Sequence, residues 1–268
     1  MSPAYILLET STSLCSVALL EGDKITATRF SDHPRAHASM TAPFVKEVLD
    51  ERGLKVSDCS AVCLSMGPGS YTGLRVGSST AKGLCFGGGI PLLAVGTLDV
   101  LVAQALAEGL PAGCRYIVPM IDARRMEVYT AIYTADGERL TEVAPVVVDS
   151  SFPDSVPVAG EAVPSGNCSH PRLHKREGPT SVAQWEGSRS DVSGGNSLSG
   201  VLFIGDGVAK CEPVLAGEGR WFRQECPRAD AMKEPALREW QAGRFRDIAY
   251  FEPFYLKDFI ATTPKKLF

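Results

Sequence analysis

The sequence is poor in the features that mark several large protein classes. None of its apolar runs approaches the ~20 residues that a membrane-spanning helix needs. A net charge of −4 leaves no excess of basic residues for gripping nucleic acid over a broad surface. Four histidines occur in 268 residues, and no Ser/His/Asp or Cys/His set stands out, so a stand-alone hydrolase is poorly supported. The 44% share of hydrophobic residues is ordinary for a globular protein and excludes wholesale disorder.

The eight cysteines form no Cys-x-x-Cys pair, and several lie inside apolar, strand-like runs. We interpret them as small buried hydrophobic residues, since a disulfide or metal role needs a recognisable spacing. Residues 1–9 contain no basic segment ahead of their apolar run, and Glu9 interrupts that run. The sequence therefore predicts a cytoplasmic protein without a signal peptide or a membrane segment.

The composition changes between residues 151 and 200, where 22 of 50 residues are Gly, Ser or Pro. Hydrophobic periodicity is strong before residue 148 and returns at residue 201. This pattern predicts a flexible surface insertion over about residues 157–199. A basic cluster at 172–176 could contact RNA, but a solvated patch of charge is the simpler interpretation.

The remaining sequence repeats one strand-rich pattern. Glu9 and Asp122, 113 residues apart, each stand at the end of an apolar strand that is followed by a tight turn and two further strands. Such a repeat predicts an α/β fold of two similar lobes with a cleft between them. We expect strands at 5–10, 15–20, 24–30, 61–66, 90–95, 116–122, 127–134, 138–140 and 201–205, and helices at 38–52, 71–86, 97–107 and 229–242.

These elements define the expected domains. The first lobe spans residues 1–108, and a C-terminal helix at 228–245 packs back onto it. The second lobe spans residues 109–227 and contains the insertion, and residues 246–268 form a C-terminal tail.

Four turns are candidates for facing a phosphate or nucleotide: the loop 67–73, the turn after the first strand, its repeat at Asp122 and the glycine turn at 205–207. The loop 67–73 joins a buried strand to a helix, so its backbone N–H groups and the helix dipole favour an anion. It is neither a P-loop nor Gly-x-Gly-x-x-Gly, and its glycines suit close helix packing equally well. The turn after the first strand offers a carboxylate and hydroxyls, or simply closes a hairpin. The candidate residues facing a nucleotide are Glu9, Thr10, Ser11, Gly67, Gly69, Ser70, Asp122, Gly205 and Asp206.

Five segments of the sequence resemble the TsaB (YeaZ) family. They are residues 6–11, 67–77, 81–84, 121–124 and 252–256, and the block Gly-Pro-Gly-Ser-Tyr-Thr-Gly-Leu-Arg-Val-Gly at 67–77 is highly specific. The likeness covers most of the chain outside residues 150–200. It implies a duplicated two-lobe fold of the actin/Hsp70/sugar-kinase (ASKHA) type.

The resemblance also implies a function. Family members are non-catalytic subunits that pair with the transferase TsaD to make threonylcarbamoyladenosine in tRNA, and the ATPase TsaE completes the complex. The chain would then have no cofactor of its own, would meet ATP, magnesium and tRNA only within the complex, and could form a homodimer in isolation.

One departure from the transferase supports a non-catalytic role. TsaD-like sequences carry metal-binding histidines after the glycine-loop helix, where this chain has Thr97 and Leu101. A hydroxyl and an isobutyl group cannot hold iron or zinc in such a site. We therefore predict no catalytic and no metal-binding residue.

The resemblance places the partner interface on the helices at 38–52 and 71–86. Apolar residues stand on more than one face of the first helix, and glycines spaced by four on the second would let another helix approach. Alternatively, both faces are covered within the monomer. The predicted interface residues are Met40, Phe44, Val48, Tyr71, Thr72, Gly73, Arg75 and Gly77.

Two other functions remain open at this point. An ATP-dependent kinase or ATPase of the same fold would use Glu9 and Asp122 to hold magnesium beside a phosphate. A peptidase is the third alternative, but the sequence supplies neither its metal ligands nor its nucleophile.

Overall fold

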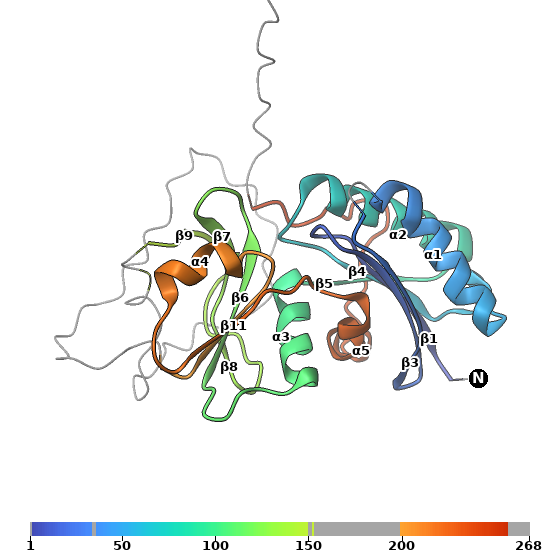
Figure 1. Cartoon of the computed structure of the whole chain (residues 1–268). Coiled ribbons are helices and arrows are strands. Elements are labelled where there is room, and N and C mark those ends of the chain that lie inside the picture. The colour runs from blue at the N-terminus through green and yellow to red at the C-terminus, as the bar shows by residue number, and fades with distance from the viewer. Residues whose placement is uncertain (1, 34–35, 150–151, 153–198, 257–268) are drawn as a thin grey trace, which may run out of the picture. The chain divides into compact units, whose positions relative to one another are not determined.

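The computed structural model describes residues 2–33, 36–149, 152 and 199–256. The chain divides into two compact units, which are described separately (Figure 1). The first unit comprises Met1–Thr97 with Glu239–Phe268, and the second comprises Leu98–Arg238. The sequence predicted that the first lobe would end at residue 108 and the second lobe at residue 227. Residues 157–198 of the predicted insertion and residues 257–268 of the predicted tail lie outside the described residues.

The first unit is built on a five-stranded sheet with the strand order β3-β2-β1-β4-β5. β1 is the central strand, antiparallel to β2 and parallel to β4. All six of its residues are buried, as expected of a strand whose two faces are both covered. The strands are β1 (Ala4–Glu9), β2 (Cys15–Glu21), β3 (Lys24–Ser31), β4 (Ala61–Ser65) and β5 (Leu92–Val95).

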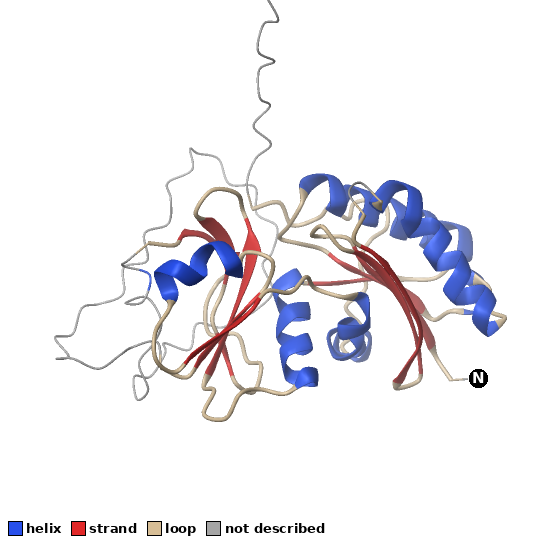
Figure 2. Cartoon of the chain, in the orientation of Figure 1, coloured by secondary structure: helices blue, strands red, loops and turns tan. Residues whose placement is uncertain are grey.

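Two helices, α1 (His37–Arg52) and α2 (Tyr71–Gly88), cover one face of this sheet (Figures 1 and 2). α1 ends at Gly53, whose φ of 65° is the left-handed conformation typical of a glycine cap. A short 3₁₀ turn, η1 (Val56–Asp58), precedes β4. On the opposite face Tyr5 packs edge-to-face on Trp240, with 5.4 Å between the ring centroids.

The second unit repeats this topology. Its strand order, read from the far edge, is β9-β7-β6-β10-β11, with two antiparallel pairings followed by two parallel ones, as in the first unit. The predicted duplicated α/β fold is thereby confirmed. The strands are β6 (Tyr116–Asp122), β7 (Glu127–Thr130), β8 (Tyr133–Thr134), β9 (Ala144–Val147), β10 (Val201–Ile204) and β11 (Arg220–Arg223), and the helices are α3 (Thr97–Glu108) and α4 (Val208–Leu215).

The predicted strand at 127–134 is interrupted. Both of its parts, β7 and β8, pair with β6 in one register, and Pro119 of β6 lies between the two paired stretches. Proline has no N–H to donate to a neighbouring strand. Across the gap the N–H of Ile132 donates instead to the hydroxyl of Thr141 at 2.9 Å.

Other predicted boundaries are also corrected. Residues 138–140 form only an isolated bridge, from Arg139 to Tyr133, and the third strand of the repeat is β9. β11 was not predicted, because its four residues are all half-buried and show no strong apolar run. The predicted helix at 229–242 is a 3₁₀ turn, η3 (Ala229–Met232), followed by α5 (Lys233–Gln241).

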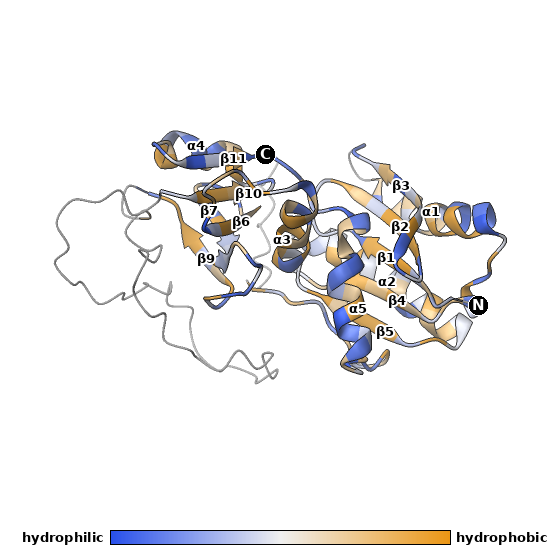
Figure 3. Cartoon of the chain, turned by 90° about the horizontal axis from the view of Figure 1, so that it is seen from below, coloured by the Kyte–Doolittle hydropathy of each residue, from blue (hydrophilic) through white to orange (hydrophobic). Residues whose placement is uncertain are grey.

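Hydropathy follows burial in both sheets, as Figure 3 shows for the apolar central strands. The seven described cysteines are free thiols, and five of them are buried, in line with their interpretation as small hydrophobic residues. Within the described ranges, none of the helices has both the length and the hydrophobicity required to cross a bilayer.

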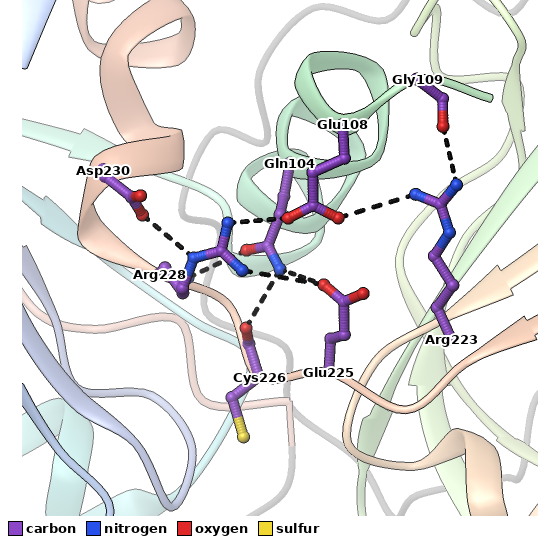
Figure 4. A network of polar contacts seen from close by, with 8 residues as sticks. All are labelled: Gln104, Glu108, Gly109, Arg223, Glu225, Cys226, Arg228 and Asp230. Atoms are coloured by element: carbon purple, nitrogen blue, oxygen red, sulfur yellow. Dashed lines mark hydrogen bonds and ion pairs between the residues drawn. The ribbon is translucent and has the colours of Figure 1, made fainter.

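A polar network in the second unit fastens α3 to the segment after β11 (Figure 4). The fully buried amide of Gln104 donates to the Glu225 carboxylate at 2.6 Å and accepts the N–H of Arg228 at 3.2 Å. Glu108 pairs with both Arg228 and Arg223, at 2.7 and 3.6 Å. The ion pairs are partly exposed and individually weak, so the buried amide is the main anchor of this network.

Candidate functional site

The two candidate phosphate turns of the first unit lie directly against each other. The N–H of Ser70 donates to the carbonyl of Ser11 at 2.6 Å, and the Thr10 hydroxyl donates to the carbonyl of Gly73 at 2.9 Å. A Cβ atom on Gly69 would overlap the Ser11 carbonyl oxygen. These polar groups are therefore used within the chain, and the turns close on one another.

Gly67 takes part in the same closure from the other side. Its φ of 111° is a conformation that favours glycine, and a Cβ atom there would lie 2.8 Å from the carbonyl oxygen of Phe254. Phe254 also donates its N–H to Met66 at 2.7 Å. The end of the described chain is thus packed against the glycine loop.

The glycine stripe of α2 faces inward. Gly73 and Gly77 are buried, and a Cβ atom on either would overlap Thr10, at its carbonyl oxygen or at its hydroxyl. The prediction that this stripe is open to another helix is wrong, because the turn after β1 already occupies it. Close approach is indeed the purpose of the stripe, but the approaching segment belongs to the same unit.

The apolar residues expected on a second, free face of α1 are buried in the core of the first unit. Phe44 is 6% exposed and Val48 is not exposed at all, and both belong to the core of the first unit. Met40 is half-buried against the same core. The prediction of a free apolar face on α1 is wrong because α1 contacts β2, β3 and α2 together, which covers a wide part of its circumference.

Other predicted interface residues do remain at the surface. Tyr71, Thr72 and Arg75 are exposed on the first turns of α2. They border an open groove of about 440 Å³ between the start of α1 and α2. The groove is lined by Ala38, Tyr71, Thr72, Arg75, Val76, Ser79 and Thr80.

Glu9 is fully buried at the end of β1. One carboxylate oxygen accepts the N–H of Ser11 at 2.7 Å. Burial raises the pKa of Glu9 to about 7, so near neutral pH much of this carboxyl is protonated. Because Glu9 is fully buried, its carboxyl presents no exposed oxygen to a hydrated magnesium ion. In the described part of the chain, no group of three or more His, Cys, Asp or Glu residues is placed to hold a metal ion.

The corresponding turn of the second unit brings Asp122, Gly205 and Asp206 together. The N–H of Asp122 donates to the Asp206 carboxylate at 2.9 Å, and a Cβ atom on Gly205 would overlap the Met120 carbonyl. Burial, and to a smaller extent the charge of Asp122, raise the pKa of Asp206 to about 6.

Sequence reasoning missed the cation of this turn. Lys210, in the first turn of α4, forms an ion pair with Asp122 and also donates to the carbonyl of Glu127 at 2.7 Å. Asp122 is therefore neutralised within the chain. The available signal was a lysine in the first turn of the helix after Gly205-Asp206-Gly207, at the end of the strand that runs parallel to β6.

The positions where the resemblance expected histidines of a transferase carry no metal ligand set. Thr97, in the first unit, is fully buried and shares a hydrogen bond of 2.7 Å with the Ser65 hydroxyl. Leu101, in the second unit, is fully buried.

The closed glycine packing leads to a stability prediction on one helix. Gly73→Ala should lower the free energy of unfolding by about 2–3 kcal/mol, because the added methyl group overlaps a backbone carbonyl. The matched control is Gly83→Ala, where nothing lies within 4 Å and alanine should stabilise the helix by ~0.5–1 kcal/mol. Denaturant titrations of both variants test this, and equal effects would contradict the packing role of Gly73.

The buried carboxyl of Glu9 predicts a pH dependence. Its pKa rises from 4.5 to about 7 on folding, so the folded state holds the proton that the unfolded state has released. Stability should therefore fall as pH rises from about 4.5 to about 7, by roughly 3 kcal/mol at most. Glu9→Gln keeps the acceptor for Ser11 and should remove this part of the fall. Unfolding free energies at pH 5 and pH 8 measure it, and an unchanged pH dependence in the variant would refute the assignment.

Comparison with known proteins finds relatives of this chain. The family model of TsaD, tRNA N6-adenosine threonylcarbamoyltransferase, matches residues 31–162. The tRNA threonylcarbamoyladenosine biosynthesis protein TsaB of Escherichia coli is 35% identical over 131 residues, covering 49% of this chain and 55% of that protein. The TsaB protein of Haemophilus influenzae is 39% identical over 125 residues, covering 46% and 51%. The chain thus spans little more than half the length of these curated relatives.

Solved structures extend the likeness to nearly the whole chain. A Pseudomonas aeruginosa protein described as similar to the peptidase YeaZ superposes with a TM-score of 0.70 at 25% identity, covering 95% of this chain and all of that one. YeaZ from the same organism gives a TM-score of 0.67 at 26% identity, again over 95% of this chain and all of that one. Together with the specific glycine block, these matches support the assignment of the chain to the TsaB (YeaZ) family.

Proposed function

We propose that this protein is a non-catalytic component of tRNA threonylcarbamoyladenosine synthesis in the cytoplasm. It docks onto the transferase TsaD through the exposed face of α1 and α2, orients or activates that enzyme, and meets tRNA and the ATPase TsaE only within the complex. The observation that carries the proposal is the closure of the predicted phosphate turns, while residues at the start of α1 and α2 stay exposed around an open groove.

The state of the predicted nucleotide residues supports a non-catalytic role. The Ser70 N–H and the Thr10 hydroxyl donate hydrogen bonds to carbonyls within the chain. Glu9 is buried and partly protonated near neutral pH. In the second unit Asp122 is already paired with Lys210. The alternative of an ATPase with Glu9 and Asp122 on magnesium is therefore not favoured, and Thr97 and Leu101 give a peptidase or transferase metal no ligand set.

The composition of the exposed helix face supports docking. It presents the small residues Ala38, Ala42, Thr72 and Ser79. Small side chains lose little conformational entropy when a partner covers them, and they let a helix backbone come close. α2 carries two basic residues and no acid over its whole length, which is typical of the charge-depleted centre of an interface.

The first test of this function is reconstitution. The purified chain with ATP, threonylcarbamoyladenylate and tRNA should leave the tRNA unmodified, because it supplies no catalytic group for the transfer. Adding TsaD and TsaE should produce threonylcarbamoyladenosine, measured by mass spectrometry of digested tRNA. Robust modification by the chain without TsaD would contradict the proposal.

The second test concerns the docking face. Ser79→Arg places a long charged side chain in the groove and should weaken binding to TsaD by roughly 30-fold or more, equivalent to about 2 kcal/mol. Ala107→Arg is the matched control, since Ala107 is an exposed helical residue of the second unit. Calorimetric titration with TsaD compares the two variants, and equal affinities would exclude the α1–α2 face.

A further inference from the structure

We infer that Arg75 is the charged anchor of the docking face and that the partner protein supplies a carboxylate to pair with it. This inference rests on the proposed function and adds the chemistry of the partner's contacting surface. It concerns a single guanidinium group in a groove that is otherwise lined by uncharged side chains.

The guanidinium of Arg75 is held in place before any partner arrives. It lies over the ring of Tyr71, 5.5 Å from the centroid, and its Nη1 donates to the Tyr71 hydroxyl at 3.2 Å. Tyr71 in turn packs on Tyr255, with 5.0 Å between centroids. Pre-positioning reduces the entropy that an arginine loses on binding.

Tyr255 is itself placed by the closure of the glycine loop. The neighbouring Phe254 donates its N–H to Met66 and presses its carbonyl against Gly67. The stacked pair of Tyr71 and Tyr255, which supports Arg75, therefore depends on the same packing that closes the phosphate turn.

No acid of the described chain forms an ion pair with Arg75. Other arginines of the first unit are paired: Arg29 with Glu47 and Glu51, and Arg244 with Glu239. Arg75 keeps its charge unmatched at the surface, where water can solvate it. The groove thus presents one uncompensated positive charge.

Covering this face changes the energetics of that charge. A partner that seals the groove removes the water around Arg75, and a buried charge without a counter-charge carries a large penalty. The planar guanidinium matches a carboxylate with two parallel hydrogen bonds. A partner that binds here tightly must therefore present an Asp or Glu among small or apolar residues.

The surroundings favour a protein carboxylate over an RNA phosphate. Binding an RNA backbone takes several cations along the path of the phosphates. Among the groove-lining residues Arg75 is the only charged one, so the groove suits one acidic side chain on a partner helix.

Substitution of Arg75 tests the inference in the intact chain. Arg75→Met keeps the stem and removes the charge, and it should weaken binding to TsaD about 10- to 100-fold and flatten the dependence of affinity on salt. Arg75→Lys should recover only part of the loss, because a lysine ammonium cannot donate two parallel hydrogen bonds to a carboxylate as a guanidinium does. Arg125→Met, an exposed arginine of the second unit, is the matched control and should bind like the wild type.

A charge exchange identifies the partner residue. Arg75→Glu should abolish binding, and one Asp→Lys or Glu→Lys variant of TsaD should restore it. If Arg75→Met binds TsaD normally while Ser79→Arg does not, the carboxylate anchor is wrong and the docking face stands. Loss of affinity for isolated tRNA, with unchanged TsaD binding, would likewise overturn it in favour of a phosphate. Failure of the wild-type chain to bind TsaD would overturn the proposed function and the anchor together.

Discussion

The packing of the turn after β1 against the first turns of α2 is the constraint on which the first unit depends. Thr10 and Ser11 contact Gly69, Gly73 and Gly77 at distances that only glycine allows. This one contact fixes the position of α2 on the sheet, pairs the Ser70 N–H and the Thr10 hydroxyl with carbonyls of the facing turn, and lies beside the buried Glu9. It also decides which residues of α2 are left on the outside.

The glycine block therefore acts through packing. From the sequence alone, the glycines of residues 67–77 fitted an anion-binding loop and close helix packing equally well. The structure favours packing, because the N–H of Ser70 and the hydroxyl of Thr10 both have partners within the chain. A specific motif can thus be recognised from sequence while its physical role needs the long-range contact that it makes.

Because long-range contacts cannot be read from the sequence, the predictions that succeeded are those that rest on a local pattern. Strands such as β1 and β4 are apolar throughout because both faces of their sheet are covered, and this local signal survives without any structure. The short strands β9 and β11 are mostly half-buried and gave no such signal. The break at Pro119 was readable in principle, since proline rarely pairs inside a sheet.

The predicted site residues divide along similar lines. Tyr71, Thr72 and Arg75 were assigned to the partner interface through the family resemblance, and they lie exposed on the first turns of α2. Phe44 and Val48 were misassigned because periodicity shows how many sides of a helix are apolar but not how many neighbours cover it. Lys210 was missed because its partner Asp122 is 88 residues away in the sequence.

The two copies of the repeat share one topology but surround their strand-end acids, Glu9 and Asp122, differently. In the first, the helix after the parallel strand carries glycines, so it approaches the turn closely and the acid Glu9 is sealed in a largely uncharged environment. In the second, the helix after β10 carries Lys210, which forms an ion pair with the surface residue Asp122. The difference follows from the residues on one helical turn. On the outer side of the first turns of α2 it leaves Tyr71, Thr72 and Arg75 exposed.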